Sequence, residues 1–307
     1  MLEYGSILVV GTVRNVANTV NSEINRCLQA LYAFETVKFH LVESDSTDKT
    51  IEELNKLKAS VANFSYETLG DLAREIPDRL ERIRYCRNYY VNFIRALDQN
   101  DRPTYVLVVD LDGMNTALNS DSILSCFIRD DWDVVVSNQT FGYYDILALR
   151  HPTWQSNDWV EEYESEKKKI VYNKTNNWLQ RTKYKLQLDR IKSRVLYSKM
   201  IRIKKNNQWI KIDSGFGGAA IYKSEVFNKF DYSKEFQTTE TDHVSLHRKL
   251  IRDGGKIYIN PQFINSHFNT YNLNRIFLIR QLRSLIWSND HIYESKVYKV
   301  LKNLLTK

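Results

Sequence analysis

The stretch VLVVDLDGMN, residues 106–115, leads from four apolar residues directly into two aspartates that are one residue apart. The apolar run predicts a buried strand, and Asp110 and Asp112 then fall where that strand ends. Carboxylate oxygens are the hard ligands that Mg²⁺ and Mn²⁺ prefer in proteins. The stretch therefore predicts a divalent-metal site at the end of a strand.

Other strands are predicted on both sides of this one, and helix-like segments separate them. Apolar, largely β-branched runs cover residues 6–13, 37–43 and 132–138. This alternation predicts parallel βαβ units, and hence an α/β fold with its functional groups at the carboxyl ends of the strands. Such ends hold Arg14, Glu43, Asp45, Asp110 and Asp112. We expect these side chains to share one cleft.

The bulk composition is that of a globular chain. Its 307 residues are 43% hydrophobic, which is enough for a sizeable core. No apolar run is long enough to span a bilayer, and the opening MLEYGSILVV lacks a basic segment before its apolar residues, so we expect a first strand in a cytoplasmic protein. The three cysteines show no CxxC pair and predict neither a disulfide framework nor a zinc site.

The positive charge is concentrated in one segment. The chain has a formal net charge of +7, and residues 161–205 hold 14 Lys and Arg against 5 Asp and Glu, a net of +9. Such a segment can attract a polyanion, an anionic membrane or a phosphate-bearing substrate, and a solvated helical face is an equal alternative. We interpret residues 153–208 as a partly helical insertion and residues 275–307 as a tail of basic amphipathic helices.

The sequence DLDG after an apolar strand admits other interpretations. It also opens the haloacid-dehalogenase-like phosphatases, but Met114 stands where those enzymes place a threonine, and the motif comes here after about 100 residues of βαβ pattern. A turn capped by the aspartates is the structural alternative.

The strand end FHLVESDSTDKT, residues 39–50, adds a second polar cluster. Capping of the next helix explains Ser46, Thr47 and Asp48, but not Glu43 and Asp45 before them. The two clusters together fit a nucleoside diphosphate donor. The first strand ends would bind the nucleoside, and Asp110 and Asp112 would reach the diphosphate through Mg²⁺ or Mn²⁺.

In these elements the sequence resembles the GT-A glycosyltransferases, and most of all the fungal capsule-associated mannosyltransferase family and its bacterial relatives. The resemblance covers residues 5–150 and 210–270, and from the opening residues we expect no N-terminal membrane anchor like that of the fungal members. The matching elements are Glu43-Ser-Asp-Ser-Thr-Asp-Lys-Thr50, Arg84-x-x-Arg87-Asn88, Asp110-x-Asp112 and Gly215-Phe-Gly-Gly218. The resemblance implies a GT-A domain over residues 1–274, with a mostly parallel central sheet flanked by helices.

The resemblance also implies roles for further residues. GT-A enzymes often complete the metal shell with a histidine late in the domain, which would be His267. They also place an acidic catalytic residue near a helix start, which would be Glu240 or Asp242. Helix capping is the alternative role for both acids. For His243 and His247, four residues apart, we favour packing over metal binding. The residues expected to contact the donor are Arg14, Glu43, Asp45, Arg87, Asp110, Gly217 and Gly218, with Arg84 as a further phosphate-binding candidate.

The sequence thus predicts a metal-dependent glycosyltransferase that moves a sugar from a UDP- or GDP-sugar to a glycan or a lipid-linked acceptor. The basic insertion and tail suggest a peripheral enzyme on an anionic membrane that builds a bacterial surface polysaccharide, and the resemblance favours retention of the anomeric configuration. A sugar nucleotidyltransferase is the alternative, although GTVRNVAN has one glycine and no phosphate-binding loop. A nucleic-acid-binding module would leave Asp110 and Asp112 unexplained, so nucleic acid is not an expected partner.

Overall fold

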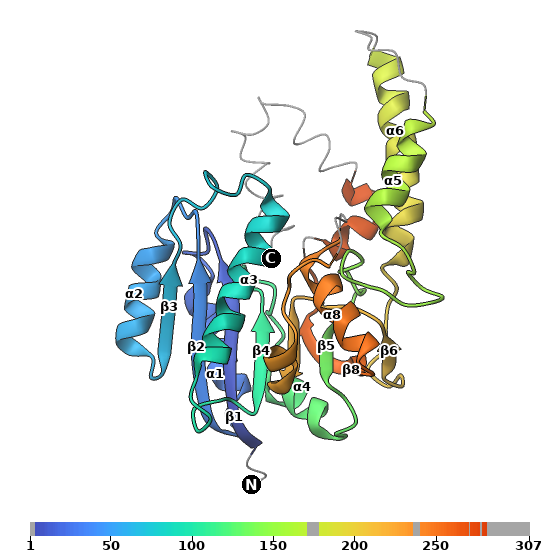
Figure 1. Cartoon of the computed structure of the whole chain (residues 1–307). Helices are drawn as coiled ribbons and strands as arrows, with labels where there is room; N and C mark the ends of the chain where they lie inside the picture. The colour runs from blue at the N-terminus through green and yellow to red at the C-terminus, as the bar shows by residue number, and fades with distance from the viewer. Residues whose placement is uncertain (1–3, 171–177, 236–239, 270, 277, 281–307) are drawn as a thin grey trace.

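The computed structural model describes residues 4–170, 178–235, 240–269, 271–276 and 278–280. One eight-stranded sheet runs through them in the order β3-β2-β1-β4-β7-β5-β8-β6 (Figure 1). The strands are β1 Tyr4–Val13, β2 Phe34–Glu43, β3 Phe64–Thr68, β4 Tyr105–Val109, β5 Val134–Gln139, β6 Ile210–Ile212, β7 Ala219–Lys223 and β8 Ile257–Ser266. The chain therefore has the predicted α/β fold.

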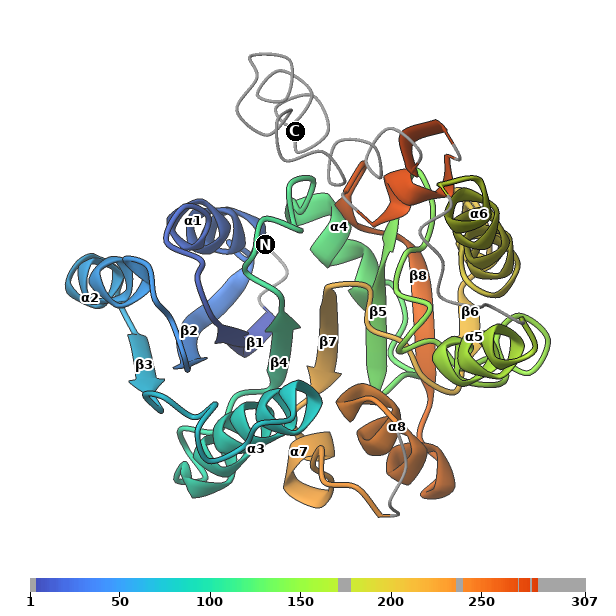
Figure 2. The same cartoon turned by 90° about the horizontal axis from the view of Figure 1, so that it is seen from above.

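Helices cover both faces of this sheet (Figure 2). Side chains of α3, α7 and α8 pack on one face, and those of α1, α2 and α4 pack on the other. The helices are α1 Val20–Ala30, α2 Thr50–Ser60, α3 Arg79–Ala96, α4 Ser120–Leu124, α5 Trp159–Lys168, α6 Trp178–Val195, α7 Glu225–Lys229 and α8 Asp242–Arg252, with single 3₁₀ turns η1 Ser125–Phe127, η2 Tyr197–Lys199 and η3 Asn272–Arg275.

The apolar run at residues 106–109 lies in β4, and it is buried on both faces. Val106 and Val108 belong to the core on one side of the sheet, and Leu107 and Val109 belong to the core on the other. This alternation explains why the run is continuously apolar: each successive side chain points to the opposite face, and helices cover both.

The pairing is mixed. β1 pairs in parallel with β2 and β4, and β5 pairs in parallel with β8. β7, which follows the glycine-rich turn, lies antiparallel between β4 and β5, and β6 is an antiparallel edge strand. The strand order reverses direction between β1 and β4, and the crevice beyond such a switch point is where α/β sheets bind ligands.

The predicted insertion forms a helical hairpin of α5 and α6, which we call the arm. It rises beyond the carboxyl edge of the sheet (Figure 1), and the two helices contact each other. The tail predicted from residue 275 lies mostly outside the described residues. Arg280 is described; it is buried and pairs with Asp189 on α6 at 2.8 Å.

Two simpler expectations concern cysteines and membrane spans. Cys27, Cys86 and Cys126 are all buried, and each is free. Within the described part of the chain, no helix combines the length and the apolar character that a bilayer crossing requires.

Candidate functional site

A cleft of about 510 Å³ opens at the carboxyl ends of β1, β2 and β4. Its walls come from the first turns of α3 and α8, from the loop after β5 and from the base of the arm. Of the residues predicted from the sequence, it is lined by Arg14, Asp45, Arg87, Asp110, Asp112 and Asp242. The fold therefore brings together most of the predicted site at its switch point.

Asp110 and Asp112 lie on the floor of this cleft, directly after β4. The backbone N–H of Asp110 donates to the carbonyl of Gly218 at 2.9 Å, and its own carbonyl accepts from Asn115 Nδ2 at 2.5 Å. The Asp112 side chain is exposed, and 35% of the Asp110 side chain is open to solvent. The backbone is thus fixed while both carboxylates face the cleft.

Arg87 is the cation beside these carboxylates. Its guanidinium is buried, lies 3.7 Å from Asp110 and forms a close ion pair with Asp242. The same group lies over the rings of Phe216 and Tyr232, at 5.2 and 5.6 Å. Arg87 therefore joins α3, the end of β4 and the start of α8, and its charge is already engaged by the protein.

Negative charge is crowded in the cleft. Enclosure by the protein raises the pKa of Asp110 to about 8; Arg87 opposes this shift, and the neighbouring Asp112, Asp145 and Asp242 add to it. Desolvation by the surrounding protein likewise raises the pKa of Asp112 and of Asp145. A cation or a cationic complex in the cleft would relieve this crowding.

Asp145 was not predicted from the sequence. It follows β5 by six residues and lines the cleft, and its carboxylate accepts from the backbone N–H of Gly217 at 3.0 Å. Asp110 was predicted because it directly follows a strand. Asp145 lies at the same edge of the sheet, but a loop separates it in sequence from the end of β5, so its place could not be predicted.

No group of three His, Cys, Asp or Glu side chains is arranged to hold a metal ion alone in the described part of the chain. Asp110 and Asp112 nevertheless fit a weaker kind of site. Mg²⁺ is commonly bound by one or two carboxylates and completed by substrate phosphates and water. The donor set is therefore suited to a metal–diphosphate complex rather than to a free ion.

His267 is not part of that set. It is exposed, its ring nitrogen Nδ1 lies 2.9 Å from Thr140 Oγ1, and it lines a separate hollow of about 620 Å³ with Asn119 and Lys205. The resemblance had suggested His267 as a metal ligand, and His267 does follow a strand. That strand is β8, which the antiparallel β7 and then β5 separate from β4 in the sheet.

Of the residues predicted near the end of β2, Arg14 and Asp45 line the cleft and Glu43 does not. Glu43 is buried and lies outside the cleft lining, because its carboxylate accepts from the backbone N–H of Ser46 at 2.9 Å and from the hydroxyl of Thr68. Asp45 lines the cleft; its Oδ1 accepts from Ala73 N at 2.7 Å. Arg14 is exposed beside it and donates from Nε to the Asp45 carbonyl at 3.2 Å.

The two glycines expected to contact the donor are structural instead. Gly217 and Gly218 have φ values of +70° and +87°, and a Cβ on them would lie 2.8 Å from Ser137 O and 2.7 Å from Tyr144 Oη. Neither glycine is among the cleft residues. They are required because the turn into β7 needs left-handed backbone packed against its neighbours.

Of the two acidic candidates near α8, Asp242 lines the cleft and Glu240 does not. Asp242 is the first residue of the helix and faces the cleft, whereas the Glu240 carboxylate pairs with Arg248 and lies outside the lining. Arg84, the further phosphate-binding candidate, is buried, donates to the Glu240 carbonyl at 2.8 Å and lies outside the cleft lining, so it anchors the helix start.

The histidines of α8 pack inside the protein, as we favoured. His243 stacks on Phe216, with ring centroids 4.0 Å apart, and His247 lies between Ser214 and Tyr222, at 3.0 and 2.9 Å. Burial lowers the pKa of His247 to about 3 and lowers that of His243 well below its ordinary value, so both rings are neutral.

Comparison with known proteins begins with two negative results. No protein-family model matches the chain, and no curated protein matches its sequence.

Several solved structures match the chain in fold. A mannosyltransferase from Pyrobaculum calidifontis in complex with GDP-Man and Mn²⁺ has a TM-score of 0.45 and 11% identity over 85% of this chain. TarS from S. aureus in complex with UDP-GlcNAc has a TM-score of 0.39 and 13% identity over 83% of the chain. Glucosyl-3-phosphoglycerate synthase from Mycobacterium tuberculosis with Mn²⁺, UDP and phosphoglyceric acid has a TM-score of 0.38 and 11% identity over 85% of the chain. The chain spans 56% of the mannosyltransferase chain, 55% of the TarS fragment, residues 1–349, and 67% of the synthase chain.

Proposed function

We propose that the chain is a metal-dependent glycosyltransferase of the GT-A type, which moves a sugar from a nucleoside-diphosphate sugar to an acceptor hydroxyl. One observation carries the proposal: two carboxyl side chains, Asp110 and Asp112, face the cleft at the switch point between β1 and β4. A diphosphate that brings a divalent cation with it satisfies both carboxylates and relieves their crowding.

The two ends of the cleft have different proposed partners. Arg14 and Asp45, over β1 and β2, would bind the nucleoside, and Asp110 and Asp112 would hold the cation with the diphosphate. A bound Mn²⁺ or Mg²⁺ would neutralise the charge that develops on the departing diphosphate. The bond from the sugar's anomeric carbon to the diphosphate breaks, and a bond from that carbon to the acceptor oxygen forms.

Asp242 is the proposed catalytic acid–base group on the acceptor side. Its ion pair with Arg87 holds the carboxylate at the cleft, where it would accept the proton of an acceptor hydroxyl. We propose retention of configuration, a cytoplasmic location and a glycan or lipid-linked acceptor in bacterial surface polysaccharide synthesis, on the resemblance described above. The anomeric configuration of the product, read by NMR, tests the first of these.

The deciding experiment is calorimetric titration of UDP and GDP, each with and without Mn²⁺. We expect one nucleotide to bind, with an affinity at least about 10-fold higher when Mn²⁺ is present, because the metal joins two carboxylates to the diphosphate. Mn²⁺ alone should bind weakly, since the described residues offer no complete metal shell. Binding of neither nucleotide contradicts the proposal, and release of pyrophosphate from a nucleoside triphosphate and a sugar phosphate would favour the nucleotidyltransferase.

A further inference from the structure

The arm presents a basic face that the protein itself does not neutralise. Asp189, the one acidic residue in the sequence of α6, is turned toward Arg280 and pairs with it at 2.8 Å. On α5, the acids Glu164 and Glu166 pair with neighbouring basic residues. Among the described residues, no carboxylate pairs with Lys168, Arg181, Lys183, Lys185 or Arg190.

Leucines are interleaved with these charges. Leu179, Lys183, Leu186 and Arg190 follow the spacing i, i+4, i+7 and i+11, so they lie on one face of α6. All four are exposed, Leu179 at 65% and Leu186 at 38%. A solvated helical face has no reason to expose leucines in register with lysine and arginine, whereas a helix that rests at a membrane interface needs both.

The described aromatic side chains of the arm are partly buried. Trp159 and Tyr163 meet edge to face with their ring centroids 6.4 Å apart, and Lys192 and Lys167 lie over their respective rings. Tyr184 is half-buried. Single-stranded nucleic acid binds on exposed aromatic platforms, so the described side chains of the arm favour a lipid surface over a nucleic acid.

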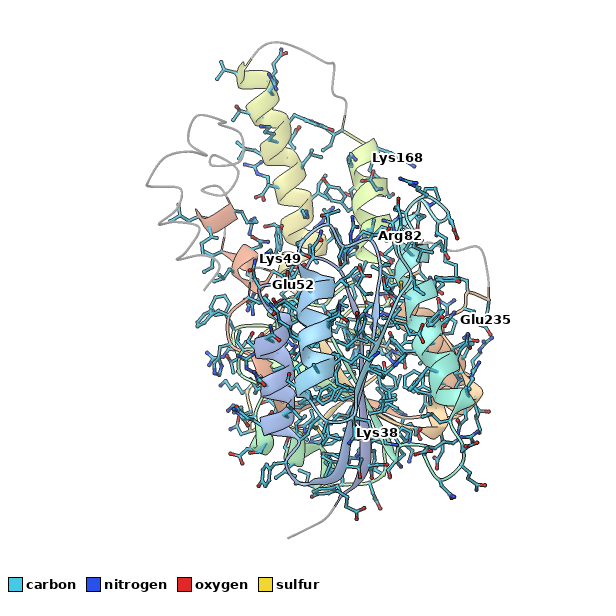
Figure 3. All side chains as sticks on the ribbon, turned by 90° about the vertical axis from the view of Figure 1, so that its left-hand side faces the viewer. Lys38, Lys49, Glu52, Arg82, Lys168 and Glu235 are labelled. Carbon is cyan, nitrogen blue, oxygen red and sulfur yellow. The ribbon has the colours of Figure 1, made fainter. Side chains whose placement is uncertain are left out.

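The position of the arm connects this face to the cleft. The 18 residues of α6 extend roughly 27 Å at 1.5 Å per residue, and Figure 3 shows Lys168 on α5, where the arm rises beyond the body. The base of the same arm supplies three residues to the cleft, Trp159, Leu196 and Met200, all of them apolar. The arm is thus basic and leucine-bearing outside and apolar where it meets the cleft.

We propose that the face formed by Leu179, Lys183, Leu186 and Arg190 docks the chain on a bilayer that contains anionic phospholipid. The basic side chains bind the headgroups, and the two leucines enter the boundary between headgroups and acyl chains. Docking by the arm brings the cleft to the membrane and suits an acceptor held there. The docking itself does not depend on sugar transfer, because none of its four residues lines the cleft.

The test is flotation of the full chain with phosphatidylcholine vesicles, with and without phosphatidylglycerol. The wild type should float with the anionic vesicles only, and the double variant Lys183→Glu, Arg190→Glu should partition at least about 25-fold less, at about fivefold for each basic residue lost. The matched control is Lys58→Glu, Lys229→Glu, which makes the same charge change on exposed residues of α2 and α7. It should stay within about twofold of wild type, since screening confines the effect to charges near the surface.

A second variant separates the leucines from the charges. Leu179→Ser, Leu186→Ser should lower partitioning while leaving its salt dependence unchanged, because both basic residues remain. Three results overturn the proposal: a wild type that does not float, equal losses in the arm and control charge variants, or an arm variant that loses binding to single-stranded RNA but keeps its binding to vesicles. Nucleotide titration on the same variants keeps the two proposals apart, since flotation can fail while metal-dependent nucleotide binding persists, and the reverse.

Discussion

The carboxylates at the end of β2 and those at the end of β4 are the same chemical group at the same edge of one sheet, yet the protein uses them differently. Both oxygens of Glu43 accept hydrogen bonds from within the protein, from Ser46 N and from the Thr68 hydroxyl. Asp110 and Asp112 face the cleft and crowd each other, and among the described residues no other side chain donates a hydrogen bond of ordinary length to either carboxylate. Position at the carboxyl edge is therefore necessary for a ligand site, but it is unused acceptor capacity that makes one.

The difference has an energetic counterpart. A saturated carboxylate such as Glu43 stabilises the loop around it, and removing it costs stability. A crowded and partly open one such as Asp112 costs stability until a ligand arrives, and removing it costs binding. Variants at the two strand ends should therefore separate stability from affinity, and each of those below tests that separation.

The largest effect is expected from Arg87→Met. This change leaves Asp242 buried beside Asp110 without its cation, and breaking a buried ion pair from one side costs about 3–5 kcal/mol. Urea denaturation measures the loss. The control is Arg82→Met at the β2 end, where Asp45 keeps its bond from Ala73 N, and there we expect about 1 kcal/mol. Equal losses in the two variants would mean that the β4 cluster does not depend on Arg87.

Asp112→Asn should lower the metal-dependent nucleotide affinity about 100-fold, since it removes one of two charged ligands from the proposed metal–diphosphate complex. Because the side chain is exposed and makes no structural bond, the free energy of unfolding should change by no more than about 0.5 kcal/mol. Calorimetry and urea denaturation measure the two quantities. Asp101→Asn is the matched control, because it removes the same charge from the opposite edge of the sheet, where Asp101 pairs with Lys38. Nucleotide binding that survives Asp112→Asn would remove the metal site from the β4 end.

Glu43→Gln should have the opposite profile. The amide keeps one acceptor for Ser46 N or Thr68 Oγ1 and turns a donor toward the other, which costs about 1–2 kcal/mol of folding stability. Nucleotide affinity should stay within about twofold, because the side chain does not line the cleft. A stable variant with tenfold weaker nucleotide binding would restore Glu43 to the role that the sequence suggested.

These contrasts show how far the sequence could be interpreted. Strand runs with alternating helices were sufficient for the α/β class and for the edge of the sheet at which the cleft opens, and Arg87 and Asp242, which the resemblance singled out, both line that cleft. These inferences succeeded because periodicity and strand ends are local properties of the chain.

The remaining assignments depend on contacts that are distant in sequence. Asp145 is positioned by the N–H of Gly217, 72 residues away, so nothing near it in the sequence marks it as a cleft residue. Gly217 itself suggested close approach of a ligand, but the atom that excludes a side chain there is the carbonyl oxygen of Ser137. His267 follows a strand as predicted, but the order of the strands in the mixed sheet places it in another hollow.

Asp45 shares features with the saturated Glu43 and with the open Asp112. Asp45→Asn should therefore have the smallest effect, and it tests which of the two Asp45 resembles. Asn tolerates the residue's φ of +59°, and its Oδ1 can still accept from Ala73 N, so stability should fall by no more than about 1 kcal/mol. The second oxygen, Oδ2, makes no hydrogen bond within the described structure, although Arg82 Nε lies 3.6 Å away, and Asp45 lines the nucleoside end of the cleft. If a nucleoside donor group uses that oxygen, replacing a charged acceptor by an amide should weaken nucleotide binding about fivefold in calorimetry, since hydrogen bonds to charged groups are stronger by about 1 kcal/mol. An unchanged affinity would assign Asp45 to the saturated class with Glu43, and the open carboxylates would then belong to the β4 end and the loop after β5.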